Sequence, residues 1–290
     1  MSAVIEPEMG RLRLFLQMIR IEHTLFILPF AFAGAILARA GAVTPRQVFW
    51  ITLAMIGART AAMAFNRLAD QDYDGRNPRT MERALPKGLL TRPRVWAYFA
   101  ASVLLYFLSA FELNWLCFFL SPAALFFLLF YSYTKRFTWL SHLFLGFAEA
   151  LAPAGAWLAV AGSIERPVIW LGLGVMFWVA GFDVLYAMQD IDFDRREGLH
   201  SIPRRFGLRA SFGWARAFHL ATMVFFGLVG VELNLGWIYW AGLAASVALL
   251  AYEHAIVSPR DLRRLNTAFF TVNGIVSVAF FGFALAAVLL

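Results

Sequence analysis

Long apolar runs separated by short polar segments dominate this chain of 290 residues. A helix of about 20 mostly apolar residues spans the hydrocarbon core of a bilayer, and runs of this length with few charges predict such helices. No low-complexity stretch or Ser/Gly-rich linker divides the sequence. The expected fold class is therefore all-α: a polytopic membrane protein with a single domain over residues 1–290. The pattern predicts nine transmembrane helices, at residues 24–40, 48–66, 95–111, 114–131, 141–161, 167–188, 212–231, 236–257 and 267–289.

The composition agrees with this class, because 61% of the residues are hydrophobic and only 15% are charged. Soluble domains contain about a quarter charged residues. Residues 1–10 lack the apolar core of a cleavable signal, so the first apolar run is expected to remain as a helix. Residues 11–20 mix basic and apolar side chains and are expected to lie along the cytoplasmic membrane interface.

The distribution of basic residues predicts the orientation in the membrane. When the polar segments are assigned alternately to the two sides, one side receives 20 of the 25 Lys and Arg residues and the other receives three. Such an excess marks the cytoplasmic side. It places the N-terminus and the polar segments 67–94 and 190–211 in the cytoplasm, and the C-terminus outside. The net charge of +7 then reflects topology next to a lipid bilayer, and we expect no nucleic-acid partner.

Two acidic runs of the same pattern follow the second and sixth apolar segments. Residues 70–76 and 190–196 both read D-x-D-aromatic-D-x-R, and they lie 120 positions apart. Carboxylates four residues apart on a helix point the same way. Two such pairs would form a cage of oxygen ligands that suits Mg²⁺, and Mg²⁺ in proteins often shares its shell with substrate phosphates. The alternative, a solvated helix end, explains one such run more readily than two. The pattern therefore favours a diphosphate-handling site at the membrane surface.

Helical periodicity selects which carboxylates would act together. If the helices continue through the acidic runs, Asp72 and Asp192 point away from the shared faces. One shared face collects Arg59, Asn66, Asp70 and Asp74. The other collects Asp183, Tyr186, Asp190 and Asp194.

Three ionisable residues are expected within the membrane. Arg59 and Asp183 lie about two turns inside from their acidic runs, and Glu149 lies in the fifth apolar segment. Ionisable groups at such depth are costly and mark functional cavities by default. The alternative for the first two is a structural Arg–Asp pair between helices.

Lys135 and Arg136 end the fourth apolar segment, where they could hold a diphosphate and stabilise its charge as it leaves. An ordinary cytoplasmic anchor would contain the same residues. Other chemistries have less support. The five histidines lack zinc or haem spacing, and the sole cysteine, Cys117, lies between apolar neighbours.

Several motifs resemble those of the UbiA superfamily of membrane prenyltransferases. Residues 66–74 match its N-x-x-x-D-x-x-x-D motif, and residues 79–88 are similar to its R-T…R-P-L-x-x-G continuation, with Ala84 and Leu85 in place of Pro and Leu. Residues 186–194 resemble its Y-A-x-x-D-x-x-x-D motif, and residues 131–136 resemble its Y-x-x-x-K-R segment. Together these segments and the nine helices cover nearly the whole chain.

The resemblance implies nine helices around a central cavity and a Mg²⁺-dependent transfer of a prenyl group from polyprenyl diphosphate. It implies that Lys135 and Arg136 steady the diphosphate. Tyr186 shares the inward face with Asp190 and could contact substrate. The implied ligands of Mg²⁺ and diphosphate are Asn66, Asp70, Asp74, Asp190 and Asp194.

The acceptor is less narrowly indicated. Residues 22–24 and 198–203 resemble a bacterial branch that prenylates 4-hydroxybenzoate, some of whose members serve menaquinone rather than ubiquinone synthesis. The acceptor would be a hydroxyaromatic carboxylate, with a naphthoate-like acid as an alternative, and Arg59 could bind its carboxylate or serve the diphosphate. The expected location is the bacterial inner membrane, with the active site facing the cytoplasm. A remaining alternative of another class is a cation-coupled transporter, which should carry polar groups through the full membrane depth.

Overall fold

The computed structural model describes residues 10–19, 24–39, 41–259 and 261–290, and it confirms the all-α prediction. Within this part of the chain, seven helices are long and apolar enough to cross a membrane, with a shorter apolar segment at Phe26–Ala38. The predicted count of nine spanning helices is not established by this criterion, although a helix lies at each predicted range. The helices at the predicted ranges, which we call the long helices although α2 is shorter than the rest, are α2 (Thr24–Ala38), α3 (Pro45–Ala69), α5 (Arg92–Leu113), α6 (Trp115–Thr134), α7 (Ser141–Ala161), α8 (Arg166–Ala187), α10 (Ile202–Glu232), α11 (Trp237–Ile256) and α12 (Asn273–Leu289).

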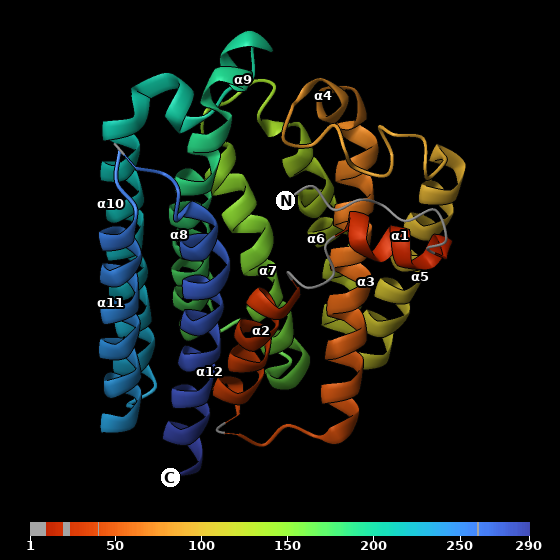
Figure 1. The fold of residues 1–290 in the computed structure, drawn as a ribbon. Coiled ribbons are helices and arrows are strands. Elements are labelled where there is room, and N and C mark those ends of the chain that lie inside the picture. The colour runs from red at the N-terminus through yellow and green to blue at the C-terminus, as the bar shows by residue number, and fades with distance from the viewer. Residues whose placement is uncertain (1–9, 20–23, 40, 260) are drawn as a thin grey trace.

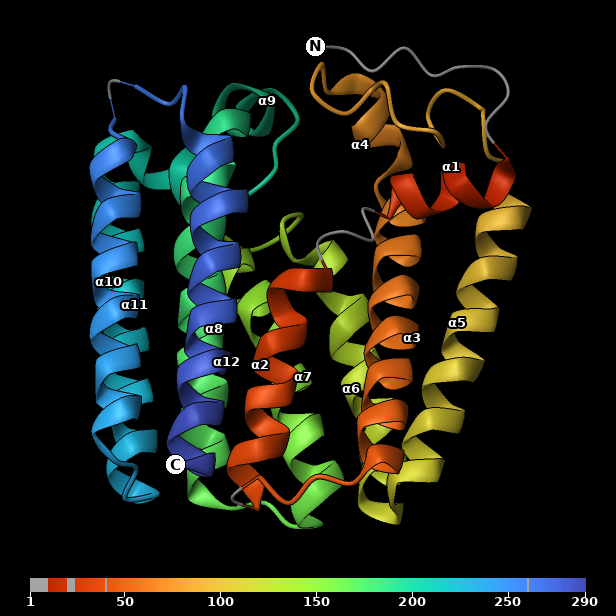
Figure 2. The same ribbon diagram turned by 60° about the horizontal axis from the view of Figure 1, so that its bottom comes forward.

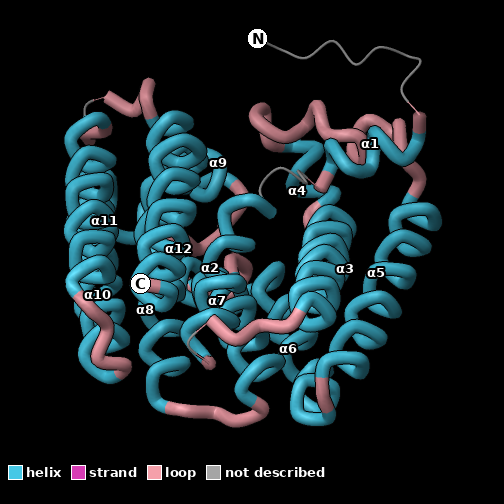
Figure 3. The backbone as a smooth tube through the Cα atoms, turned by 90° about the horizontal axis from the view of Figure 1, so that it is seen from below, coloured by secondary structure: helices cyan, strands magenta, loops and turns pink. Residues whose placement is uncertain are grey.

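The long helices form a bundle in which α2 and α7 lie between two groups (Figure 1). One group contains α3, α5 and α6, and the other contains α8, α10, α11 and α12, as the view from below shows (Figure 3). The short helices α4 (Gln71–Arg76) and α9 (Ile191–Arg196) lie at one end of the bundle, and the C-terminus lies at the other. Both acidic runs are therefore brought to the same end.

Small residues allow the central helices to approach closely. A Cβ atom at Gly34 of α2 would come within 2.3 Å of the Pro153 carbonyl oxygen of α7, and one at Gly146 within 2.1 Å of the Met176 carbonyl oxygen of α8. Helix association in lipid depends on such close packing, because lipid tails are as apolar as the side chains. Aromatic residues fill the space beyond, with the Phe30 ring 4.7 Å from Trp178. These contacts fix the positions of α7 and α8, which carry part of the site.

The N-terminal helix α1 (Arg11–Met18) lies across the ends of α3 and α5, nearly perpendicular to them (Figure 2). Phe15, Met18 and Ile19 are buried in one cluster with Leu68 and Leu90. The apolar side of α1 therefore packs against the protein. The helix itself lies at the bundle end, where the sequence predicted an interfacial segment. Residue 20 of the predicted interfacial segment lies outside the described residues.

Helix α10 begins ten residues before the predicted range 212–231. The Ser201 hydroxyl accepts a hydrogen bond from the Arg204 backbone N–H, and a proline follows at the helix start, both of which favour initiation. Gly207 then adopts a φ of 78°, in the left-handed region, and kinks the helix. The sequence prediction missed this turn because the segment is too polar to read as a membrane span.

Candidate active site

The helical character continues almost unbroken through the first acidic run. α3 ends at Ala69, and Asp70 has φ −101° and ψ 10° before α4 begins. The i to i−4 hydrogen bonds nevertheless persist, at 2.9 Å from Asp70 N to Asn66 O and 2.7 Å from Asp74 N to Asp70 O. Asn66, Asp70 and Asp74 thus keep nearly the register of a single helix.

The second run has a matching backbone. A 3₁₀ turn at Met188–Asp190 joins α8 to α9, and Asp190 has φ −100° and ψ 6°. Asp74, Asp190 and Asp194 are buried, whereas Asp72 and Asp192 are exposed, as the helical-face prediction required. The two runs are therefore alike in local structure as well as in sequence.

A cavity of about 320 Å³ opens between the two runs and extends toward the middle of the bundle. All ten residues selected from the sequence line it: Arg59, Asn66, Asp70, Asp74, Lys135, Arg136, Asp183, Tyr186, Asp190 and Asp194. We call it the polar cavity.

The four motif carboxylates do not converge into one cage in this structure, and their role as metal ligands stays a prediction. Among the described residues, no group of three or more His, Cys, Asp or Glu side chains is placed to hold a metal ion. Basic side chains lie between the carboxylates instead. Arg79 donates to both Asp190 oxygens, at 2.6 Å from Nη2 and 3.0 Å from Nε, and Asn77 adds a bond of 3.2 Å. A loop that follows the first run therefore holds the second.

Asp74 is bound by two guanidinium groups. Arg83 lies 2.7 and 2.8 Å from its two oxygens, and Arg67 lies 3.2 Å away. Burial raises the pKa of Asp74 to about 6, helped by the charge on Asp70 and opposed by Arg67. A buried carboxylate of this kind depends on a cation beside it to remain ionised.

Asp70 accepts hydrogen bonds from Asn66 at 3.0 Å and from Arg136 at 3.2 Å. Burial raises the pKa of Asp70, although Arg136 opposes the shift. Arg136 also donates to the Ala69 carbonyl and lies 4.7 Å from the Tyr133 ring centre, so its head group is fixed from several sides.

Asp194 accepts a hydrogen bond of 2.7 Å from Ser201, the residue that caps α10. Burial alone would lower the pKa of the neighbouring Lys135, but the charges of Asp194, Asp183 and Asp190 raise it. Lys135 therefore keeps its positive charge inside the cavity.

Deeper in the bundle, Arg59 and Asp183 do not form the structural pair that the sequence left open as an alternative. Arg59 Nη1 lies 3.2 Å from Glu149 Oε1, which joins α3 to α7. Asp183 instead lies 2.6 Å from His142 Nδ1, and His142 Nε2 accepts from the Ile202 backbone N–H. Glu149 thus enters the site as the partner of Arg59.

Sequence reasoning missed several residues that line the polar cavity or bind its carboxylates. Two of them, Arg79 and Arg83, lie in the segment that resembles the family continuation, which was the available signal. Arg67 looked like one more cytoplasmic anchor, and the others had no distinguishing pattern. The missed residues are Arg67, Asn77, Arg79, Arg83, Ser132, His142 and Ser201.

The sequence of the chain matches the UbiA prenyltransferase family over residues 27–286. It is 31% identical over 280 residues to the 4-hydroxybenzoate octaprenyltransferase of Cupriavidus necator, covering 95% of this chain and 98% of that protein. It is 33% identical over 229 residues to the enzyme of the same name from Salmonella paratyphi B, covering 79% and 78%.

Solved structures share the fold. An apo UbiA homologue from Aeropyrum pernix K1 superposes with a TM-score of 0.84 and 35% identity, covering 93% of this chain and 99% of that one. A homologue from Archaeoglobus fulgidus, bound to GPP and Mg²⁺, gives a TM-score of 0.72 at 19% identity, covering 96% and 100%.

The apolar helices of membrane-spanning length, which surround a polar cavity, define an integral membrane protein. The chain belongs to the UbiA prenyltransferase family. It is an aromatic prenyltransferase.

Proposed function

We propose that the protein transfers a polyprenyl group from polyprenyl diphosphate to a hydroxyaromatic carboxylate of the 4-hydroxybenzoate type, as a step in ubiquinone or menaquinone biosynthesis. The observation that carries this proposal is the polar cavity, in which the carboxylates of the two acidic runs and their basic partners lie beside a second, mostly apolar cavity. The names of the Cupriavidus and Salmonella relatives support the acceptor class. We take residues 1–290 to act as one membrane domain.

The donor atoms of the site fit Mg²⁺. They are carboxylate oxygens from the two acidic runs and one amide oxygen, all on residues that line the polar cavity. Mg²⁺ is commonly bound through one or two carboxylates, with phosphate oxygens completing its shell. The residues that would hold it are Asn66, Asp70, Asp74, Asp190 and Asp194. When bound, Mg²⁺ supplies positive charge that offsets the charge of the diphosphate. The Archaeoglobus homologue bound to GPP and Mg²⁺ supports this assignment.

The basic residues of the cavity would receive the leaving group. Arg79, Arg83 and Arg136 each contact a motif aspartate. They would become available to phosphate oxygens if those aspartates bound a metal. Together with Lys135 they would stabilise the negative charge that develops as the allylic C–O bond breaks and its electron pair stays with the diphosphate. The Tyr186 ring lies in the same wall and could stabilise the allylic cation through its face.

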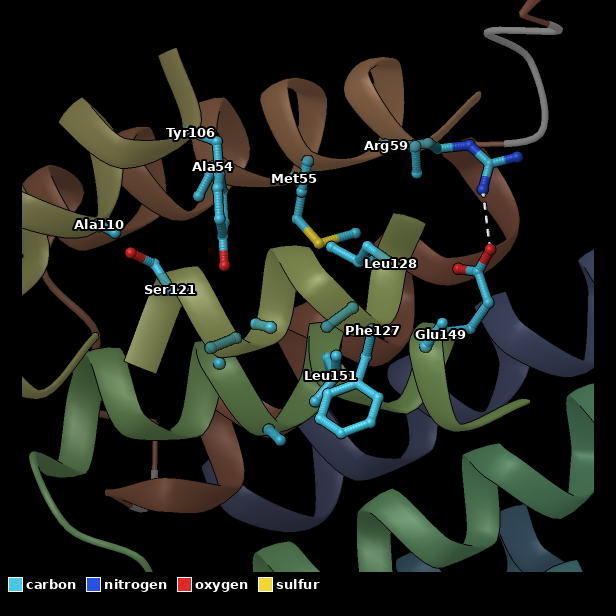
Figure 4. A pocket seen from close by; sticks show the side chains of 18 of the residues that line it. Ala54, Met55, Arg59, Tyr106, Ala110, Ser121, Phe127, Leu128, Glu149 and Leu151 are labelled. Atoms are coloured by element: carbon cyan, nitrogen blue, oxygen red, sulfur yellow. Dashed lines mark hydrogen bonds and ion pairs between the residues drawn. The ribbon is translucent and has the colours of Figure 1, made fainter. Parts of the chain in front are cut away.

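A second cavity of about 270 Å³ fits the prenyl chain. It lies between α3, α5, α6 and α7, and its walls are mostly aliphatic and aromatic (Figure 4). Burial of apolar chain there would be favourable in proportion to the area removed from water. We call it the apolar cavity. The acidic runs and the basic residues that bind them lie at one end of the bundle, which favours an enzyme over a transporter.

The proposed activity is tested by incubating the purified protein with Mg²⁺, a polyprenyl diphosphate and either 4-hydroxybenzoate or a hydroxynaphthoic acid, side by side. We expect a C-prenylated product from at least one acceptor, and its identity separates the two acceptor classes. A folded protein that yields no product with either acid would overturn the proposal.

We propose further that the protein lies in the bacterial inner membrane with this site facing the cytoplasm. In a Cys117→Ser background, a cysteine at Met81, which is exposed in the loop after α4, should react with an impermeant thiol reagent only in inside-out vesicles. A cysteine at Ser163, exposed in the turn between α7 and α8 at the other end, should react only in right-side-out vesicles. The opposite labelling would reverse the orientation.

A further inference from the structure

The two cavities meet at the Arg59–Glu149 ion pair. Both of these residues line the polar cavity and the apolar cavity, and they are the charged members of the shared wall. In Figure 4 the pair closes one end of the apolar cavity, while Tyr106 and Ser121 lie toward the other. The Arg59 and Glu149 side chains are only 12% and 25% exposed, so the ion pair is largely shielded from solvent.

Arg59 differs from the other guanidinium groups of the polar cavity in its partner. Arg79 pairs with Asp190, and Arg136 pairs with Asp70, both of which are aspartates of the acidic runs. Those aspartates are among the residues that would hold Mg²⁺, so the pairing of these arginines would change on metal binding. Glu149 belongs to neither acidic run, so Arg59 keeps its compensating charge throughout.

The pair also leaves hydrogen-bonding capacity unused. A guanidinium has five N–H donors, and the Arg59 contact to Glu149 uses Nη1. Arg59 Nε is buried and has no hydrogen-bond partner among the described residues. An unsatisfied buried donor is costly, so a group that accepts from it would bind favourably.

We propose that Glu149 is a positioning residue that compensates the charge of Arg59, keeps it out of the diphosphate site and reserves it for the acceptor. This inference rests on the proposed function. A multiply charged diphosphate is attracted mainly by net positive charge, which Glu149 cancels. A single carboxylate on the acceptor can still gain from the directional, two-point hydrogen bonds of a guanidinium.

If the Glu149–Arg59 pair only linked α3 to α7, loss of the Glu149 charge would lower stability and leave diphosphate binding unchanged or weaker. If Glu149 compensates the charge of Arg59 as proposed, loss of the Glu149 charge leaves an uncompensated guanidinium next to the polar cavity. The affinity for diphosphate then rises.

The test is calorimetric binding of inorganic diphosphate with Mg²⁺ to the full-length protein in detergent. Glu149→Gln should bind about tenfold more tightly than the unchanged protein, because one positive charge is released in a cavity of low effective dielectric. Glu149→Asp retains the negative charge, and the double variant Arg59→Gln/Glu149→Gln removes an ion pair that has no net charge. The diphosphate affinity of both should therefore stay within about threefold of that of the unchanged protein. Glu232→Gln is the matched control, since it removes a carboxylate paired with Arg166 at the other end of the bundle.

Equal or weaker binding by Glu149→Gln would overturn the inference. If that variant does not fold, the double variant decides, because a loss of more than about tenfold there would assign Arg59 to the diphosphate site. If the unchanged protein fails to bind diphosphate with Mg²⁺, the proposed function itself is overturned and this inference falls with it.

Discussion

Asp70→Asn and Asp190→Asn should each reduce turnover by more than about 100-fold. In metal sites, substitution of residues that only hydrogen-bond to the ligands typically lowers metal affinity or activity by about 10- to 100-fold, and loss of a ligand itself should cost more. Each substitution keeps the size of the side chain and one oxygen that accepts hydrogen bonds. It removes the negative charge that would hold Mg²⁺. Asp70 is also the contact of Arg136, and Asp190 that of Arg79. We expect weaker Mg²⁺-dependent diphosphate binding as well, measured by calorimetry alongside the kinetics.

Asp72→Asn and Asp192→Asn are the matched controls. Both side chains are exposed, and Asp192 is 85% exposed beside Arg195, so each variant should retain activity within about threefold. Equal losses in all four variants would contradict the division of each run into an inward and an outward face.

Arg59 should act on the acceptor. Arg59→Ala alone would leave Glu149 as an unpaired, partly buried carboxylate, which would repel both anionic substrates and obscure the role of Arg59. In the Glu149→Gln background, loss of Arg59 should raise the acceptor KM by about 10- to 100-fold, the value of charge-assisted hydrogen bonds, and leave the prenyl diphosphate KM nearly unchanged.

The measurement is a pair of Michaelis profiles, each with the other substrate saturating. If the prenyl diphosphate KM rises and the acceptor KM does not, Arg59 belongs to the diphosphate site. Arg20 and His23 are basic residues that directly precede the first apolar run, and they lie outside the described residues. They would then be tested next as partners of the acceptor carboxylate.

Periodicity predicted the inward residues of both runs well, because the backbone hydrogen bonds of α3 continue past the break at Asp70. Asn66, Asp70 and Asp74 therefore kept the register that a simple helix would give them. The same rule correctly turned Asp72 outward. Local geometry of this kind depends on residues close in sequence, which is why one chain sufficed to predict it.

The contacts across the cavity could not be predicted in the same way. Arg79 and Arg83 reach the carboxylates from a loop without periodicity, and a loop has no face that a sequence pattern can reveal. The partner of Arg59 depends on how α7 and α8 are rotated in the bundle, which brings Glu149 rather than Asp183 to it. The arrangement of the four carboxylates could not be predicted for a related reason, since spacing within a run does not fix the distance between runs.

The most direct test of the proposed chemistry is the yield of both products in one reaction. With Mg²⁺, polyprenyl diphosphate and the preferred hydroxyaromatic acid, the protein should release inorganic diphosphate and form C-prenylated acid in equal amounts. Chelation should stop both, and added Mg²⁺ should restore both. Transfer that continues without divalent metal, or diphosphate release without prenylated acid, would contradict a metal-assisted transfer at the two acidic runs.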